Sequence, residues 1–101
     1  MILEHAILPV RPGREADFEA ALGRALPIIR RQPGCRSAEV SRCVEQPSAY
    51  LLLAVWDSIQ AHEDDFRLSA DYQEWRALLH DFYEPFPTVR HFVAVDAPSL
   101  D

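Results

Sequence analysis

His62 is the residue whose type best suits proton transfer. It stands immediately before an acidic run, Glu63, Asp64 and Asp65. A nearby carboxylate raises the pKa of an imidazole, which helps it act as a base or as a charged hydrogen-bond donor. The alternative is a solvated histidine beside an acidic run that forms a solvated helix face. His62 is therefore a candidate catalytic residue.

Aromatic residues between positions 69 and 86 could bind an aromatic molecule. This stretch holds half of the aromatic residues of the chain, namely Tyr72, Trp75, Phe82, Tyr83 and Phe86. Tyr72, Trp75, Leu79 and Phe82 recur at spacings of three and four, which places them on one face of a helix. We predict that Leu79 and Phe82 fill the core and that Tyr72 and Trp75 face a pocket. A stripe that serves the core alone is the alternative.

Trp56 and Phe66 complete the predicted site. Trp56 ends an apolar run, and its indole N–H could donate into the pocket; a large core residue is the alternative. Phe66 follows on the connection that must fold back across the end of that run, so Trp56 would floor the pocket and His62 and Phe66 would edge it. We predict His62 and Trp56 as catalytic residues and Phe66, Tyr72 and Trp75 as substrate-binding residues.

The elements that must position these residues follow from hydrophobic periodicity. Apolar runs and alternation predict strands at 2–10, 35–45, 50–56 and 88–95, and spacings of three and four predict helices at 14–31, 58–66 and from Ser69 to Pro85. Asp57 and Gln60 fit a capping box for the second helix, and Ser69 caps the third. This β-α-β-β-α-β order predicts an α+β, ferredoxin-like antiparallel sheet with helices on one face.

Both faces of the central strand are apolar. Residues 50–56, YLLLAVW, carry apolar side chains throughout, although an antiparallel sheet with one wet face should alternate apolar and polar residues. Helices from one small chain cover only one face. We therefore predict a two-fold homodimer with its sheets packed about 10 Å apart. We predict His80, Tyr83 and the Pro85-Phe86-Pro87 turn at the dimer interface, with the pocket mouth as the alternative.

Composition excludes several classes of protein. The 101 residues predict one domain, 1–101, and a net charge of −6 with scattered arginines gives no stripe that could follow phosphates, which excludes nucleic acid as a partner. No stretch approaches the ~18 apolar residues of a membrane span. Cys35 and Cys43 would lie about 26 Å apart along one strand, which predicts reduced thiols and a cytoplasmic location.

His5 and His91 fall on strands that neighbour each other in this topology. Two histidines on an apolar sheet face are more often structural than metal ligands, and the sequence offers no evident third ligand. There is no CxxC motif, no Cys/His cluster at zinc spacing and no glycine-rich phosphate loop. We therefore predict neither a metal nor an organic cofactor.

Three stretches carry a resemblance to a known family. LLLAVWDSIQAHEDDFRLSADYQEW has a strand that ends in Trp, an acid and a serine, then Ala-His on a helix, then an aromatic residue and a serine-led helix. RPGREADFEAAL and QPGCRSAEVSRC supply a first helix and a second strand. Together they resemble the antibiotic biosynthesis monooxygenase domains of the dimeric α/β-barrel superfamily.

This resemblance implies a chemistry. Members hold a pocket between the sheet and a split helical layer, and oxidise quinol-like or polycyclic aromatic compounds with molecular oxygen and no metal or flavin. An electron-rich, deprotonated substrate can itself give an electron to oxygen. The implied function is a cofactor-independent monooxygenase. A non-catalytic module that binds a small hydrophobic ligand or serves a stress response, and an isomerase or dehydratase on the same fold, are the alternatives.

A second branch of the superfamily cleaves haem with an Asn on the first strand, a Trp on the short helix and a His on the last helix. The corresponding positions here hold Ala6, Phe66 and Arg76. Because an arginine cannot ligate iron, haem degradation is disfavoured.

Overall fold

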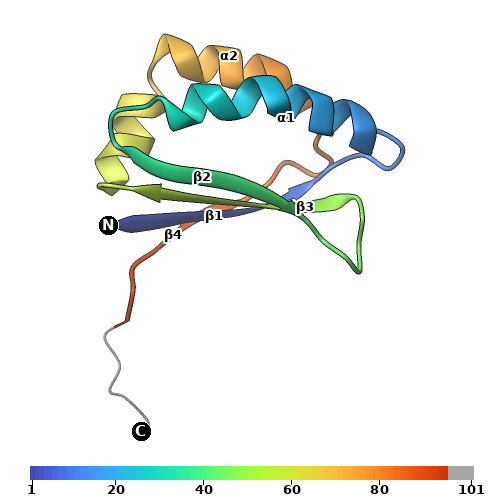
Figure 1. Cartoon of the computed structure of the whole chain (residues 1–101), viewed down its shortest axis with the longest axis horizontal. Helices are drawn as coiled ribbons and strands as arrows, with labels where there is room; N and C mark the ends of the chain where they lie inside the picture. The colour runs from blue at the N-terminus through green and yellow to red at the C-terminus, as the bar shows by residue number, and fades with distance from the viewer. Residues whose placement is uncertain (96–101) are drawn as a thin grey trace, which may run out of the picture.

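The computed structural model describes residues 1–95, which form one antiparallel sheet with helices on one of its faces (Figure 1). The elements are β1 (Ile2–Pro9), α1 (Glu15–Arg30), β2 (Cys35–Arg42), β3 (Ala49–Trp56), the π-helix η1 (Ala61–Phe66), α2 (Ala70–Leu79), the 3₁₀-helix η2 (His80–Phe82) and β4 (Val89–Phe92). The strand order is β2-β3-β1-β4. The predicted ferredoxin-like fold is confirmed.

Along β3, side chains buried against the helices alternate with side chains that point to the other face of the sheet. In β3, Tyr50, Leu52, Ala54 and Trp56 are buried against the helices, and the residues between them are only half-buried. From α1 a single stripe packs onto this face; its buried residues are Phe18, Ala21, Leu22, Ala25, Ile28 and Ile29. The core therefore lies between the sheet and the helical layer.

The outward face of the sheet is also apolar, but no element of residues 1–95 covers it (Figure 1). Ile7 of β1 and Phe92 of β4 are about half exposed, at 49% and 46%. His5 lies on this face, where its ring contacts Phe92 edge-on. His91 is paired with Glu4, and so points to the helical side. The prediction that His5 and His91 share a face was wrong. The register pairs His5 with Arg90 and His91 with Glu4, which places the two histidines on opposite faces of the sheet.

The third predicted helix is interrupted. α2 ends at Leu79, and η2 follows it. The cause is tertiary, because backbone hydrogen bonds tie the next residues to the end of β1: Arg11 N–H donates to the carbonyl of Phe82 and Glu84 N–H to that of Pro9, both at 2.8 Å. The chain must leave the helix to make these bonds.

The two predicted helix caps had different outcomes. Ser69 caps α2, since its Oγ accepts from the Tyr72 N–H at 3.2 Å, as expected. The capping box of Asp57 and Gln60 was wrong. Ser58 Oγ accepts from the Ala61 N–H at 3.1 Å instead, because the Asp57 carboxylate accepts from Arg36 on the neighbouring strand.

No helix among residues 1–95 has both the length and the apolar character needed to cross a membrane.

Candidate functional site

A small cavity lies between the inward face of the sheet and the helical layer. Its walls include Glu4 of β1, His62 and Phe66 of η1, and Tyr72 and Trp75 of α2. Its volume is about 60 Å³, enough for a few water molecules. Four of the five residues predicted for the site therefore line one cavity, and Glu4 joins them.

His62 is held rigidly at the cavity wall. Its side chain is only 3% exposed, and its ring stacks on the Trp56 indole with 5.1 Å between ring centroids. Burial, together with the charges of Arg67 and His91, lowers the pKa of His62 to about 3. The expectation that the acidic run raises this pKa was wrong, because Asp64 and Asp65 are exposed to solvent and burial outweighs them.

Glu4 is the residue of the site that sequence reasoning missed. Its carboxylate is buried beside His62, with 3.4 Å between its Oε1 and the His62 Nε2. Burial raises the pKa of Glu4, and a hydrogen bond from Trp56 opposes this rise. A signal was present in the sequence: Glu4 shares the inward register with Ala6 and Leu8, and a charged residue at such a position needs a buried partner.

Trp56 supports the cavity wall from behind. It is fully buried, stacks against His62 and Phe66, and is not among the residues that line the cavity. Its indole N–H donates to Glu4 Oε1 at 2.9 Å. We expected Trp56 to form the floor of the pocket and to donate its indole N–H into it. This was wrong, because the N–H donates to the buried carboxylate of Glu4 on the neighbouring strand β1. The catalytic role of Trp56 stays a prediction, and its contact with Glu4 is the route by which Trp56 could act.

The aromatic stripe divides much as expected. Phe66 meets Tyr72 and Trp75 edge-on, with centroid distances of 5.3 and 6.1 Å. Leu79 is fully buried core and does not line the cavity, and Phe82 packs against Phe18. Whether Tyr72 and Trp75 bind a substrate remains a prediction.

His80 and Tyr83 also line the cavity, together with Phe86. The His80 ring contacts Tyr72 and Phe86, with centroid distances of 5.9 and 4.9 Å. Burial lowers the pKa of His80 and raises that of the Tyr83 hydroxyl. Their place in the cavity wall supports the alternative of a pocket mouth. A contact of His80, Tyr83 and the Pro85-Phe86-Pro87 turn with a second copy stays a prediction.

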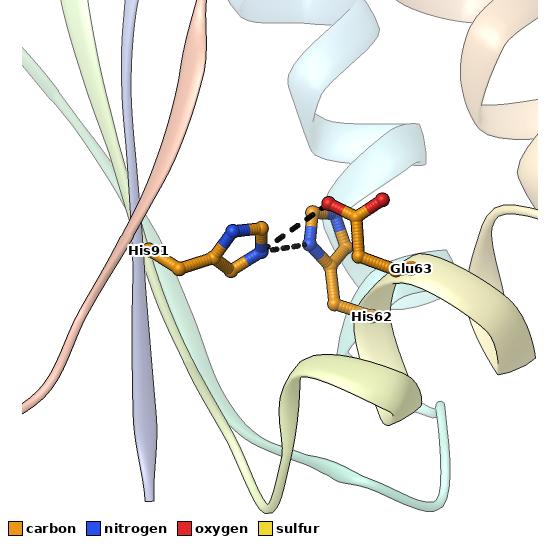
Figure 2. A group of neighbouring side chains, drawn as sticks. All are labelled: His62, Glu63 and His91. Carbon is orange, nitrogen blue, oxygen red and sulfur yellow. Dashed lines mark hydrogen bonds and ion pairs between the residues drawn. The ribbon is translucent and has the colours of Figure 1, made fainter.

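His91 and Glu63 extend the site on the side of His62 away from the cavity. Figure 2 shows all three side chains pointing toward one another, two from η1 and one from β4. His62 Nδ1 lies 2.8 Å from His91 Nε2, which requires one shared hydrogen. His91 Nε2 lies 3.7 Å from Glu63 Oε1. These ligand-type atoms all fall within 4.8 Å of one another, so this group could hold a metal ion.

Comparison with known proteins agrees with this architecture. The sequence profile described as "Antibiotic biosynthesis monooxygenase" matches residues 1–78. The chain is similar to the uncharacterised protein YczJ of Bacillus subtilis (strain 168), at 47% identity over 91% of this chain and 97% of that one. A crystal structure of a candidate antibiotic biosynthesis monooxygenase from Bordetella bronchiseptica superposes with a TM-score of 0.87 at 42% identity, over 93% and 96% of the two chains.

More distant structures share the fold alone. Rv0793 from Mycobacterium tuberculosis superposes with a TM-score of 0.78 at 21% identity, over 97% of this chain and 98% of that one. Because the family profile matches more than half of the sequence, the chain belongs to the antibiotic biosynthesis monooxygenase family.

Proposed function

We propose that this protein oxidises a small phenolic, quinol-type or polycyclic aromatic substrate with molecular oxygen, and that the substrate itself supplies the electrons. For a simple phenol, one oxygen atom of O₂ enters the ring and the other leaves as water, with both hydrogens taken from the substrate, which becomes a quinone. No metal, flavin or other cofactor takes part in this reaction. Membership of the family supports the reaction class.

The observation that carries this proposal is a buried Glu4–His62 pair in the wall of an otherwise largely apolar cavity. When the His62 Nδ1–H donates to His91, the Nε2 lone pair is free on the cavity side, 3.4 Å from Glu4. A phenol hydroxyl placed there can give its proton to this pair as electron density moves to oxygen. Because burial lowers the pKa of His62 and raises that of Glu4, His62 accepts the proton first and passes it to the Glu4 carboxylate. Trp56 is a positioning residue that acts through Glu4.

Aromatic walls would orient the ring of the substrate. Phe66, Tyr72 and Trp75 present edges and faces of the kind that small-molecule pockets use. The cavity of about 60 Å³ is smaller than the ~300 Å³ of a typical ligand pocket. Entry of a substrate therefore requires His80 and the exposed Phe86, which meet in the cavity wall, to swing outward.

The uncovered outward face of the sheet supports a homodimer. Leu51, Leu53 and Val55 of β3 lie half-buried on this face beside the more exposed Ile7 and Phe92. A second copy would bury these side chains, and an exposed apolar patch of this kind marks an interaction site. Light scattering at micromolar concentration should give twice the mass of the chain, and a monomeric mass would reject the dimer. Cys35 and Cys43 are free thiols, which fits the proposed cytoplasmic location.

Oxygen uptake tests the reaction. We expect quinol-dependent consumption of O₂, and His62→Ala should lower kcat by about 10²-fold or more. Asp65→Ala is the matched control, because Asp65 lies on the same π-helix and is exposed; it should leave kcat unchanged. A change confined to KM would assign His62 to substrate orientation instead. Circular dichroism of each variant separates a lost base from a lost fold.

Two further outcomes decide between the proposal and its alternatives. Saturable quenching of tryptophan fluorescence by a quinol, with no uptake of O₂ and no product, would support a non-catalytic binding module. Conversion of the ligand without uptake of O₂ would support an isomerase or dehydratase on the same fold. Either result would overturn the monooxygenase proposal.

A further inference from the structure

The side chains of His62, Glu63 and His91 form a group with the chemistry of a transition-metal site. Two imidazole nitrogens and one carboxylate oxygen suit ions such as Zn²⁺, Fe²⁺ or Co²⁺ better than Mg²⁺ or Ca²⁺, which prefer oxygen ligands alone. Glu63 also accepts from Arg67 through Oε2 at 3.1 Å, which leaves Oε1 on the side of His91. One ligand atom from each residue is therefore available.

The distances between these atoms are close to those that an ion would require. The pairs His62 Nδ1–His91 Nε2 and His91 Nε2–Glu63 Oε1 are 2.8 and 3.7 Å apart. Ligands held about 2.0–2.1 Å from a tetrahedral ion lie roughly 3.3 Å apart. These two distances each differ from that spacing by about half an ångström, and the three ligand atoms all lie within 4.8 Å of one another. Rotation of the side chains would therefore be enough to bring them around one ion.

The backbone elements hold the three residues in place. η1 is a π-helix, in which the Arg67 N–H reaches back to the carbonyl of His62 at 3.1 Å, and such turns are frequent at functional sites. β4 is paired with β1 so that His91 stands opposite Glu4. Rigid supports of this kind reduce the ordering cost of binding an ion.

A second layer of contacts completes the arrangement. Metal-bound histidines usually donate their other ring N–H to a carboxylate, which fixes the ring and strengthens the ligand. His62 Nε2 faces Glu4 Oε1 at 3.4 Å, and that oxygen also accepts from Trp56 at 2.9 Å. Binding an ion at Nδ1 would leave the hydrogen on Nε2, directed at this buried carboxylate.

We propose that Nδ1 of His62, Nε2 of His91 and Oε1 of Glu63 bind one divalent transition-metal ion per chain. The His91 and Glu63 side chains are 16% and 37% exposed, so an ion can enter from solvent. Neither His91 nor Glu63 lines the cavity, so the ion lies across the His62 ring from the substrate. Because an ion on Nδ1 leaves the hydrogen on Nε2, ion-bound His62 cannot accept the phenol proton, and the two roles of His62 belong to different states of the protein. His91 also lies outside residues 1–78, the part matched by the family profile. The site therefore goes beyond the proposed function and does not depend on it.

Metal titration of the whole chain tests the site, with Zn²⁺ as the probe after dialysis against a chelator. Calorimetry should show one equivalent bound per chain with micromolar or tighter affinity, and Co²⁺ should give visible absorption bands typical of nitrogen and oxygen ligands. His91→Ala and Glu63→Gln each remove one ligand and should each weaken Zn²⁺ binding by at least ~10-fold. Changes to residues that only contact the ligands of a metal site already cause losses of this size. Glu63→Gln should leave the fold intact, because the Glu63 side chain is partly exposed, so a loss of binding in this variant would not reflect misfolding.

Matched controls identify the site. His5→Ala, on the outward face of the sheet, and His80→Ala, in the cavity wall, should bind Zn²⁺ as the unmodified chain does. No binding at about 100-fold above the expected dissociation constant would overturn the proposal, as would equal binding in the His91→Ala variant, which would mean an adventitious ion elsewhere. Equal affinity for Mg²⁺ would also overturn it, because imidazole ligands discriminate against that ion. None of these measurements uses quinol oxidation, so they stand apart from the test of the proposed function.

Discussion

Gly34 is the residue at which one added methyl group should have the largest effect on the helix that carries His62. It precedes β2, and its carbonyl accepts from the Asp57 N–H at 2.8 Å. A Cβ added to Gly34 would fall deep inside van der Waals contact with the Ala61 Cβ. Ala61 is buried and begins η1. Gly34→Ala should therefore force η1 away from the sheet.

The expected magnitude follows from the atoms involved. Both colliding groups are methyls bonded directly to backbone, so neither can rotate away as the end of a long side chain could. Overpacking of this kind costs about 1–3 kcal/mol. Each kcal/mol lowers Tm by roughly 4–8 °C in a domain of this size. His62 adjoins Ala61, so quinol turnover should fall along with stability.

A double-mutant cycle with urea unfolding tests this reasoning at one fixed protein concentration. Ala61→Gly removes the opposing methyl, and on its own it should lower the free energy of unfolding by about 0.5–1 kcal/mol. The double variant should lose less unfolding free energy than the two single variants lose together, by about 1 kcal/mol or more. Gly23→Ala is the control: it lies in α1 with nothing within 4 Å of the added Cβ, and should stabilise the helix by up to ~1 kcal/mol. If Gly34→Ala unfolds at the same midpoint as the unmodified chain, or if the cycle is additive, the contact does not limit the packing of η1.

Three other changes have defined outcomes. Phe18→Ala should lower the free energy of unfolding by about 3–5 kcal/mol, measured in urea, because Phe18 is fully buried between α1 and the sheet. Tyr50→Phe removes a hydroxyl that donates to Glu19 at 2.7 Å and should cost about 1 kcal/mol by the same assay; no loss would mean that water replaces the bond. Hydrogen bonds from Arg31 and Gln32 lower the pKa of Asp71 to about 2, below its ordinary 3.8. The ionised Asp71 therefore stabilises the fold at neutral pH, and this stabilisation is lost as the pH falls from about 4 to about 2. Asp71→Asn should therefore reduce stability at neutral pH and make little difference near pH 2, and an equal difference at both would refute this linkage.

The fold was accessible from the sequence because its signals are local. The unbroken apolar run of β3, the apolar stripe of α1 and the Ser69 cap each arise within a few residues, and the structure has all three. The interruption of the last helix was not accessible, since it follows from hydrogen bonds between Phe82 and the distant Arg11. Boundaries set by long-range pairing leave little trace in a local pattern.

The site was only partly accessible for the same reason. The convergence of His62, Phe66, Tyr72 and Trp75 follows from helix spacing and the turn after β3. The burial of Glu4 and the approach of His91 depend on strand register, which shifts every side chain to the other face when it slips by one residue. The pKa of His62 could not be read from neighbouring acids, because desolvation depends on what packs around the ring.

The pairing of β4 with β1 brings the end of the described chain to its beginning, and this has a consequence for synthesis and folding. Glu4 is synthesised long before His91, and their strands can pair only after both have left the ribosome. Contacts between such distant positions carry a high loop-closure cost and tend to form late. A chain shortened before β4 would keep Glu4, Trp56 and His62 but lack His91. Nascent or clipped molecules without β4 would thus retain much of the sheet while the His62–His91 contact is missing. This contact therefore distinguishes copies that have paired β4 with β1 from copies that have not.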